Sequence, residues 1–501
     1  MEVSRRDALK AGMLGAGVLA LPIGAGIREA TAGVSTVQSP AFTPYSRPLP
    51  VAPVLQPVRT ANDVDFYEVV QQTARQEILP GLIATIWGYN GLFPGPTFMV
   101  ESGRSIVVTQ RNALTAATTG VPGGVLTTVH PHGLDVAAAS DGHPLNLVLP
   151  GGFLEHHYPN SQPAATLFYH DHAIDRTSRN VYMGLAGFYL ISDPHERSLP
   201  LPQGAFDVPL VIQDRIFNPD GSLFYPTDAG LPLSQGVLGD VILVNGAPQP
   251  FLRVQRRKYR FRLLNASDAR FYTLRLGSGD PFTVIATDGG LMPHPVPVTS
   301  LRIGVSERYS VVVDFAKYRV GTSIVLQNTD TGLFGDTVDP AKISQVMRFD
   351  VTSDATDPSS IPADLAPALD VDPAAATVTR RWVFNRDQGS WTINGRRFDG
   401  NRIDAKPKQG STEIWELVNE SGGWRHPIHV HLINYLVLDR NGAPPKPYER
   451  GPKDTVAVGP NETVRVAMKF RSQFTGTYVF HCHNISHEDN MMMSQFEVLP
   501  A

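Results

Sequence analysis

The sequence predicts an all-β protein built from three related β-sandwich domains, and three observations favour this fold class. A short pattern that begins with an Asn-Gly pair recurs at Asn90, Asn245 and Asn394, so its copies start about 150 residues apart, which is a domain-sized repeat and too long for a solenoid. Glycine (44 residues) and proline (42 residues) are frequent, as expected for many short strands joined by tight turns. Few segments have the sustained periodicity of a helix.

Each copy of the repeat combines a turn with a strand. Asn-Gly favours a tight turn with positive φ, and the alternation that follows it is typical of a half-buried strand. The three strands end in an asparagine and cover residues 105–112, 259–265 and 412–419. We therefore predict domains over residues 45–195, 205–355 and 375–501. The Pro- and Asp-rich stretch 354–373 is the expected linker before the third.

Composition narrows the class of partner. Of the 501 residues 42% are apolar and 18% are charged, which allows sizeable globular cores. The formal net charge is -4 and the pI is near 6.4. Neither nucleic acid nor an anionic membrane surface is therefore expected as a partner.

The N-terminus has the features of an export signal. Arg5 and Arg6 precede a weakly apolar run at 11–27, and residues 30–32 (Ala-Thr-Ala) offer a small-residue cleavage site. This pattern predicts a twin-arginine signal peptide over residues 1–32, and hence a periplasmic or extracellular protein. A general secretory signal and a retained anchor are the alternatives.

Histidines cluster unusually in this chain. Ten of the 15 histidines fall in four short groups, which are His130 and His132; His170 and His172; His426, His429 and His431; and His481, His483 and His487. Residues i and i+2 of a strand share a face, so each H-x-H presents a pair of imidazoles, which suit copper, zinc, iron or nickel. One such pair is commonly a chance arrangement, but four are not. Zinc fits poorly, because structural zinc needs only four closed ligands.

The single cysteine, Cys482, lies between His481 and His483. A lone thiol is ordinarily a buried, inert residue. A thiolate with two imidazoles and a weak thioether is instead the signature of a blue-copper centre. Segment 166–172 parallels segment 477–483 with aspartate in place of the cysteine, so only the last domain can build a thiolate site. Both domains can supply imidazoles to a shared interface.

The ordered motifs H-x-H-G, H-D-H-A, H-P-I-H-x-H and H-C-H-x3-H-E-D-x3-M, supported by residues 180–187 and 213–215, resemble those of the multicopper oxidases. Within that family the chain is similar to the branch of bacterial laccases, spore-coat oxidases, bilirubin oxidases and phenoxazinone synthases. The resemblance extends over nearly all of the mature chain. It implies three cupredoxin-like Greek-key domains and four copper ions, one of type 1, one of type 2 and two of type 3. It also implies one-electron oxidation of a substrate at the type 1 copper and reduction of dioxygen to water at the trinuclear cluster.

By motif position, the resemblance assigns His426, Cys482 and His487 to the type 1 copper. Met492 is its implied axial ligand, because it lies ten residues after the cysteine in the run 491–493. The resemblance gives the type 2 copper His130 and His429. It gives the type 3 pair the remaining six, His132, His170, His172, His431, His481 and His483.

Two carboxylates are further candidates. The resemblance points to Glu488 and Asp141 as proton relays in water formation. The alternative role for both carboxylates is to orient the imidazole ligands, and the sequence does not decide between the two roles. The histidines outside the motifs are expected to be ordinary loop residues, namely His143, His156, His157, His195 and His294.

The reducing substrate is the least determined feature. We expect small aromatic reductants, phenols or aminophenols, with dioxygen as the oxidant. Oxidation of Cu(I) or Mn(II), oxidation of bilirubin and a structural spore-coat role are the alternatives. Only ten methionines are present and they form no capture segment, which disfavours Cu(I). Trp424 and Arg425 beside His426 are candidate residues for the substrate mouth, and 330–343 is a candidate lid. Surface packing is the ordinary role for each.

Overall fold

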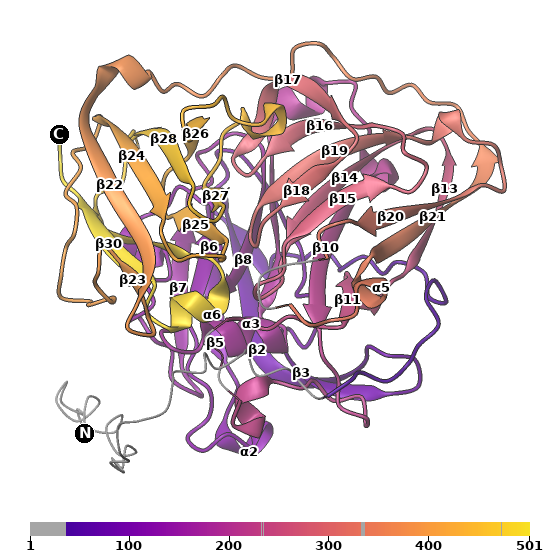
Figure 1. Ribbon diagram of the computed structural model, residues 1–501, viewed down its shortest axis with the longest axis horizontal. Helices are drawn as coiled ribbons and strands as arrows, with labels where there is room; N and C mark the ends of the chain where they lie inside the picture. Colours follow the sequence, from indigo (N-terminus) through magenta and orange to yellow (C-terminus); the bar gives the residue numbers. More distant parts are fainter. Residues whose placement is uncertain (1–36, 232, 234, 332–335, 472) are drawn as a thin grey trace, which may run out of the picture. The chain divides into compact units, whose positions relative to one another are not determined.

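The structure is a computed structural model that describes residues 37–501 except 232, 234, 332–335 and 472. The predicted signal peptide lies outside the described residues. The prediction of an all-β fold is confirmed, since six sheets account for nearly all the regular structure (Figure 1). Helices in the described part are short, at most seven residues, and their bounds are α2 (Ala116–Thr119), α3 (Thr177–Met183), α4 (Pro194–Ser198), α5 (Pro340–Ile343) and α6 (Ile485–Asp489). None of these helices is long and apolar enough to cross a membrane.

Two sheets form the first sandwich. The five-stranded sheet contains β1 (Arg59–Ala61), β2 (Val64–Glu77), β5 (Ile106–Asn112) and β7 (Phe153–Tyr158) in that order, with β3 (Ile83–Tyr89) also paired to β2. The four-stranded sheet has the order β4 (Phe98–Glu101), β9 (Ala186–Ser192), β8 (Ala165–Asp171) and β6 (Val129–His132). Two histidine motifs therefore lie on neighbouring strands, β6 and β8.

The middle sandwich is the largest. Its seven-stranded sheet has the order β12 (Ala247–Pro248), β11 (Val241–Val244), β10 (Asp207–Arg215), β14 (Lys258–Asn265), β19 (Arg308–Asp314), β16 (Phe282–Thr287) and β17 (Gly290–Val298). Its five-stranded sheet has the order β13 (Phe251–Arg256), β21 (Gln345–Asp354), β20 (Ser323–Asn328), β15 (Tyr272–Leu276) and β18 (Leu301–Ile303). None of the predicted copper ligands belongs to this sandwich.

The last sandwich repeats the plan of the first. Its five-stranded sheet has the order β23 (Ser390–Ile393), β22 (Ala376–Asp387), β24 (Thr412–Asn419), β28 (Thr463–Lys469) and β26 (Tyr435–Arg440). Its four-stranded sheet has the order β27 (Thr455–Val458), β25 (His426–Val430), β29 (Gly476–Cys482) and β30 (Met493–Val498). The other two histidine motifs thus also lie on neighbouring strands, β25 and β29.

The repeated Asn-Gly pairs make the same turn in all three sandwiches. Asn90, Asn245 and Asn394 have φ of 54°, 50° and 52°, and the glycine after each also has positive φ. Each asparagine Oδ1 accepts a hydrogen bond from a valine N–H on the neighbouring strand, at 2.7–2.8 Å. The predicted turns are therefore confirmed, and their side chains fasten each turn to its sheet.

The asparagine that ends each repeated strand also has one structural role. Asn112, Asn265 and Asn419 are buried, and each Oδ1 accepts the N–H of the residue two positions later at 3.0–3.1 Å. Their Nδ2 groups donate to backbone carbonyls of the following loop. The recurrence of asparagine in the sequence thus reflects a local turn that ends the strand and anchors the loop.

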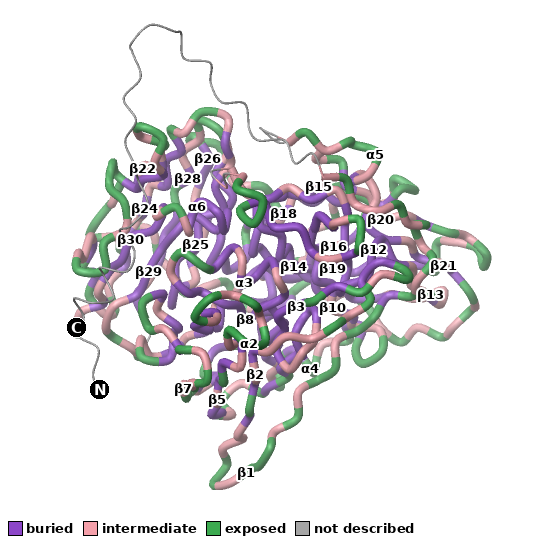
Figure 2. Tube along the Cα trace, turned by 90° about the horizontal axis from the view of Figure 1, so that it is seen from below, coloured by how far each residue is buried: buried purple, intermediate pink, exposed green. Residues whose placement is uncertain are grey.

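Each sandwich encloses its own core of buried residues, and a small cluster joins them (Figure 2). Phe98, Phe261 and Trp415 are representative core residues of the first, middle and last sandwich. The joining cluster takes one or two residues from each sandwich and consists of Val181, Ala186, Val305 and Ile485. The cores therefore provide three packed frames, and the histidine-bearing sheets of two of them face a common interior.

Replacing Asn112 by alanine should lower the free energy of unfolding by about 1–3 kcal/mol, because two buried carbonyls and one buried N–H each lose a hydrogen bond. Chemical denaturation of the copper-free protein, followed by circular dichroism, measures this loss. The control is Asn401→Ala, since Asn401 is exposed and bonds only to the nearby Asp399. Equal effects of the two substitutions would contradict the assigned role of Asn112.

Candidate metal centre

One cluster of ligand atoms gathers around Cys482 at the end of β29. The Sγ of Cys482 lies 3.2 Å from Nδ1 of His426 and 3.7 Å from Nδ1 of His487, and the two nitrogens are 3.2 Å apart. Pairing of β25 with β29 brings His426 to the cysteine, and the first turn of α6 brings His487. All three side chains are fully buried. We call these three residues the thiolate cluster.

The protonation chemistry of the thiolate cluster suits a bound cation. Burial raises the pKa of the Cys482 thiol well above its ordinary range, so an ionised thiolate is disfavoured there without a neighbouring positive charge. Burial lowers the pKa of His426 to about 3, which keeps the imidazole neutral. Its Nε2 lies 2.7 Å from Oγ of Ser421, which leaves the Nδ1 lone pair facing the sulfur. Two imidazole nitrogens and a sulfur therefore converge as metal ligands do.

The backbone of Met492 adjoins the thiolate cluster. Its carbonyl accepts from the N–H of Cys482 and its N–H donates to the carbonyl of His487, both at 3.0 Å. Met492 is fully buried in the same core cluster as the cysteine. Met491 is only half-buried, and Met493 is already on β30, paired with His481. Of the three methionines, Met492 therefore has its backbone beside the thiolate cluster and its side chain in the same core, and its role as the axial ligand stays a prediction.

A second cluster, which we call the histidine cage, holds the other eight motif histidines. Antiparallel pairing sets His130 opposite His170 in the first sandwich and His429 opposite His481 in the last. Rings from the two sandwiches then stack in pairs, His130 on His431 at 3.7 Å and His132 on His429 at 3.6 Å between centroids. Every imidazole of the cage is at most 2% exposed. The structure thus brings together side chains about 300 positions apart.

The nitrogens of the cage are divided between outward hydrogen bonds and inward lone pairs. The Nδ1 atoms of His130, His170 and His429 donate to backbone carbonyls at 2.6–2.9 Å, and their Nε2 atoms have no hydrogen-bond partner among the described residues. The Nε2 atoms of His172 and His431 point instead at Nε2 of His481, at 3.2 and 3.3 Å. Buried imidazole nitrogens left in this way are what a metal site requires. The cage therefore fits copper.

Three models of the multicopper oxidase family match the chain, over residues 71–196, 205–341 and 370–501. The chain is 40% identical over 489 residues to a bilirubin oxidase of Albifimbria verrucaria, covering 92% of this chain and 83% of that protein. The chain belongs to the multicopper oxidases. It is also 37% identical over 506 residues to a laccase of Bacillus subtilis (strain 168), covering 90% of this chain and 97% of the laccase.

Solved structures agree with this membership. A laccase from Pediococcus acidilactici Pa5930 superposes with a TM-score of 0.82 at 35% identity, covering 92% of this chain and 95% of that one. The three sandwiches are therefore cupredoxin domains, as the sequence predicted, although the domain boundaries stay a prediction. The protein is a laccase-like multicopper oxidase, and its family implies four copper ions, in agreement with the two clusters described above.

Glu488 joins two imidazoles of the multicopper oxidase cage. Its two carboxylate oxygens lie 3.1 Å from Nδ1 of His172 and 3.2 Å from Nδ1 of His481. Burial acts to raise the pKa of this carboxyl, but the two imidazoles outweigh burial and hold the pKa well below its usual range. Glu488 therefore contacts the outer nitrogens of both rings, which is the position that an orienting role requires.

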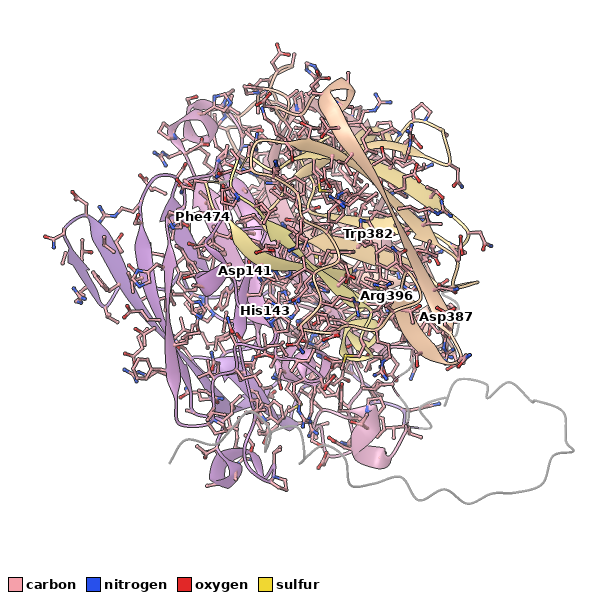
Figure 3. All side chains as sticks on the ribbon, turned by 90° about the vertical axis from the view of Figure 1, so that its left-hand side faces the viewer. Asp141, His143, Trp382, Asp387, Arg396 and Phe474 are labelled. Atoms are coloured by element: carbon pink, nitrogen blue, oxygen red, sulfur yellow. The ribbon has the colours of Figure 1, made fainter. Side chains whose placement is uncertain are left out.

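Asp141, labelled in Figure 3, contacts cage imidazoles as Glu488 does, but it belongs to the first sandwich. It lies in the segment that follows β6. Its Oδ2 lies 2.7 Å from Nδ1 of His431, and its backbone carbonyl accepts from Nδ1 of His130 at 2.6 Å. One residue of the first sandwich thereby positions ligands from both sandwiches. Orientation of imidazoles, which the sequence left as one of two roles, is geometrically satisfied by both carboxylates.

The expectation that the remaining histidines lie in loops is wrong for four of the five. His156 and His157 are on β7, His195 is in α4 and His294 is on β17; only His143 is in a loop. Alternation along β7 buries His156 and exposes His157. Burial lowers the pKa of His156 to about 4, so it is a neutral core residue.

Several residues at the site were not found from the sequence. Trp391 stacks on His487 at 3.8 Å between ring centroids, and Asp454 lies 3.1 Å from Nε2 of His132. Neither residue belongs to a recognisable motif, and a single aromatic or acidic residue in or next to a strand is too common to indicate a site. The only available signal was that Asp454 immediately precedes a strand.

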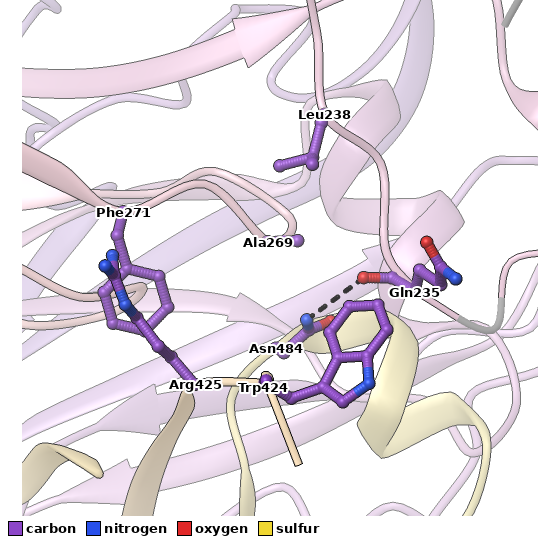
Figure 4. A pocket seen from close by; sticks show the side chains of 8 residues that line it. Gln235, Leu238, Ala269, Phe271, Trp424, Arg425 and Asn484 are labelled. Carbon is purple, nitrogen blue, oxygen red and sulfur yellow. Dashed lines mark hydrogen bonds between the residues drawn. The ribbon is translucent and has the colours of Figure 1, made fainter. Parts of the chain in front are cut away.

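Trp424 and Arg425 line a small hollow next to the thiolate cluster (Figure 4). The Trp424 ring lies 5.6 Å from that of His487. Nη1 of Arg425 lies 2.6 Å from Oδ2 of Asp330, at the start of the predicted lid. Further along this segment, Asp336 is ion-paired with the buried Arg270. The described parts of 330–343 are therefore tied to the hollow and to the middle sandwich.

Replacing Met492 by leucine should raise the reduction potential of the type 1 copper, since loss of a weak axial donor destabilises Cu(II) more than Cu(I). Redox titration of the visible absorption of the copper-loaded protein measures the shift. Met491→Leu and Met493→Leu are matched controls and should leave the potential nearly unchanged. A larger shift at either control position would move the axial assignment.

Proposed function

We propose that this multicopper oxidase oxidises small electron-rich aromatic molecules, phenols or aminophenols, with dioxygen as the electron acceptor. The observation that carries the proposal is the position of the small hollow at Trp424 and Arg425, since the Trp424 ring lies 5.6 Å from the ring of His487 and an aromatic molecule resting at the mouth of the hollow would be close to the thiolate cluster. The similarity to bacterial laccases at 36–37% identity supports the same substrate class.

The proposed copper ligands follow from the two clusters. His426, Cys482 and His487 would hold the type 1 copper, with Met492 as the axial ligand. The cage would hold the rest, the type 2 copper on His130 and His429 and the type 3 pair on His132, His170, His172, His431, His481 and His483. Copper in these sites supplies one-electron transfer from the substrate and reduction of dioxygen to water.

The chain itself contributes connection, orientation and exclusion of water. Cys482 is bonded through the backbone to His481 and His483, and strand alternation directs its side chain to the opposite side from theirs. A single short strand thus links the two clusters. Because every proposed ligand is buried, the clusters are kept from bulk water, which limits side reactions of partly reduced oxygen.

Other substrates are supported less well. The bilirubin oxidase relative keeps bilirubin as a second candidate, at 40% identity. Cu(I) is disfavoured because the ten methionines form no capture segment, whereas Mn(II) is disfavoured only by the presence of an aromatic-lined hollow. A structural spore-coat role remains the non-enzyme alternative, supported by nothing in the site.

We also propose that the protein is exported by the twin-arginine route and is active outside the cytoplasm. Arg5, Arg6 and the small-residue site at 30–32 support this, and N-terminal sequencing of the secreted protein tests it. A mature N-terminus that retains the two arginines would contradict it.

Turnover of a phenol, an aminophenol, bilirubin, Cu(I) and Mn(II), measured side by side, tests the proposed substrate class. The phenol rate should rise with pH toward the phenol pKa of about 10, because the phenolate gives up an electron more readily. A non-phenolic donor should lack this rise.

Cys482→Ser is the control and should abolish both the blue colour and oxidation of every donor. A ten-fold preference for Cu(I) or Mn(II), about 1.4 kcal/mol, would overturn the proposal.

Replacing Glu488 by glutamine should slow reoxidation by dioxygen more than reduction by substrate, because only the dioxygen half-reaction consumes protons. Stopped-flow traces of the two half-reactions measure the difference. Glu497→Gln, a change of a carboxylate on β30 outside both clusters, should affect neither. Equal slowing of both half-reactions in Glu488→Gln would favour orientation of His172 and His481 as its only role.

A further inference from the structure

His132 differs from six of the other seven imidazoles of the cage in which nitrogen faces outward, and the seventh, His483, has no hydrogen-bond partner on either nitrogen among the described residues. Its Nε2 lies 3.1 Å from Oδ1 of Asp454, and its Nδ1 has no partner among the described residues. In His130, His170 and His429 the unpartnered nitrogen is Nε2. Nδ1 is close to the Cβ and Nε2 is on the far side of the ring, so exchanging them would move the ligand atom. The orientation of His132 therefore needs a specific partner.

That partner, Asp454, is held by an arginine of the middle sandwich. Nη1 of Arg308 donates to Oδ1 of Asp454 at 2.7 Å, and Nη2 of the same guanidinium donates to Oδ2. Arg308 and Asp454 are both at most 1% exposed. A two-pronged pair of this kind fixes the plane of the carboxylate as well as its position.

Arg308 is also bonded to the backbone around it. Its Nε donates to the carbonyl of Thr166 on β8 at 3.1 Å, and Nη1 donates to the carbonyl of Ser306 at 2.9 Å. Nη2 reaches the carbonyl of Asp288 at 3.3 Å. One guanidinium thus meets all three sandwiches, with Thr166 from the first, Ser306 and Asp288 from the middle and Asp454 from the last. Lysine has no planar array of donors with which to do this.

The backbone beside His132 lies directly against the pair. A Cβ on Gly133 would come within 2.6 Å of Oδ2 of Asp454 and 2.8 Å of Nη2 of Arg308, and Gly133 has a φ of +86°. Glycine is therefore required by both space and conformation. The pair consequently contacts His132 through its ring and through the next residue of the chain.

A second layer of buried charge supports the pair. Lys453 Nζ lies 3.0 Å from Oδ2 of Asp288 and 3.1 Å from Oε1 of Glu307. Both oxygens of Asp454 accept hydrogen bonds from the Arg308 guanidinium, and Oδ1 also faces Nε2 of His132 at 3.1 Å. Asp454 is thus placed as the acceptor for an N–H on Nε2 of His132, which leaves Nδ1 as the lone-pair nitrogen.

We propose that Arg308 is a positioning residue for the trinuclear site, which acts through Asp454 to hold His132 with Nδ1 toward the copper ions. The middle sandwich supplies no proposed ligand, and through this arginine it nevertheless sets the geometry of one. The inference rests on the proposed function, because it takes His132 as a copper ligand. Through Arg308, the position of the middle sandwich relative to the cage therefore determines the orientation of a proposed ligand.

The test compares Arg308→Gln and Arg308→Lys with the unmodified protein after copper loading. Copper retained per chain is measured after dialysis against a chelator, and electron paramagnetic resonance reports whether the type 3 ions remain a coupled, silent pair. We expect the affinity of the trinuclear site for copper to fall about 10–100-fold in Arg308→Gln, as for loss of other partners of metal-bound histidines. Arg308→Lys keeps the charge without the fork and should lie between. The type 1 blue absorption should be unchanged in both.

Arg262→Gln is the matched control. Arg262 is a buried arginine of the middle sandwich that also bonds Thr166, through Oγ1 at 3.0 Å, and pairs with Asp207 rather than Asp454. Its replacement weakens docking of the same two sandwiches and should leave copper retention and the resonance spectrum unchanged. A similar loss in Arg262→Gln would overturn the proposal, because the loss would then follow from docking alone.

The proposal is also overturned if Arg308→Gln and Arg308→Lys both keep full copper and a silent type 3 pair. If Arg308→Gln does not fold, Arg308→Lys decides by the same two measurements. Failure of the proposed function is distinguishable, since it would appear in the unmodified protein as absence of the blue absorption or of cage copper.

Discussion

A buried imidazole nitrogen that lacks a partner carries a free-energy cost, and this constraint organises the interior of the protein. Eight histidines are buried where the β6–β8 sheet faces the β25–β29 sheet. Carbonyls and carboxylates satisfy most of their outer nitrogens, whereas the inner ones face only one another. Bound copper completes them. The packing of the two sandwiches and the binding of metal are therefore coupled, because each sandwich supplies only part of the ligand set.

The middle sandwich contributes to the position of the ligands through a network of buried charged side chains. Placing Arg308, Lys453, Asp288, Glu307 and Asp454 in the interior carries a desolvation cost of several kcal/mol per ion, which is offset only by close mutual pairing. Such a network stabilises little by itself, yet it is sensitive to small displacements, because a misplaced charge loses its partner without regaining water. A network of this kind is suited to fixing position, and the position it fixes is that of His132.

Local patterns made much of the molecule predictable. The H-x-H pairs, the Asn-Gly turns and the strand-ending asparagines all depend on contacts within a few residues or on strand periodicity. The partners of the ligands are different: Asp454 is 322 positions from His132, and Trp391 stacks on His487 across the last sandwich. No local pattern encodes such contacts. The expectation of a loop for His156 rested only on its absence from the histidine motifs, whereas alternation on β7 turns its side chain inward.

The thiolate cluster shows why the metal and the fold support each other. Burial disfavours the thiolate of Cys482 and favours neutral His426, so without a cation a protonated thiol lies 3.2 Å from a neutral imidazole nitrogen. Binding of a cation would release that proton and join the sulfur and the two imidazole nitrogens through the ion. The ring of Trp391, stacked on His487, covers this imidazole on one face and so limits the access of water to it. A site that is unfavourable without its ion and closed to water is thereby selective for an ion that accepts both sulfur and nitrogen, as copper does.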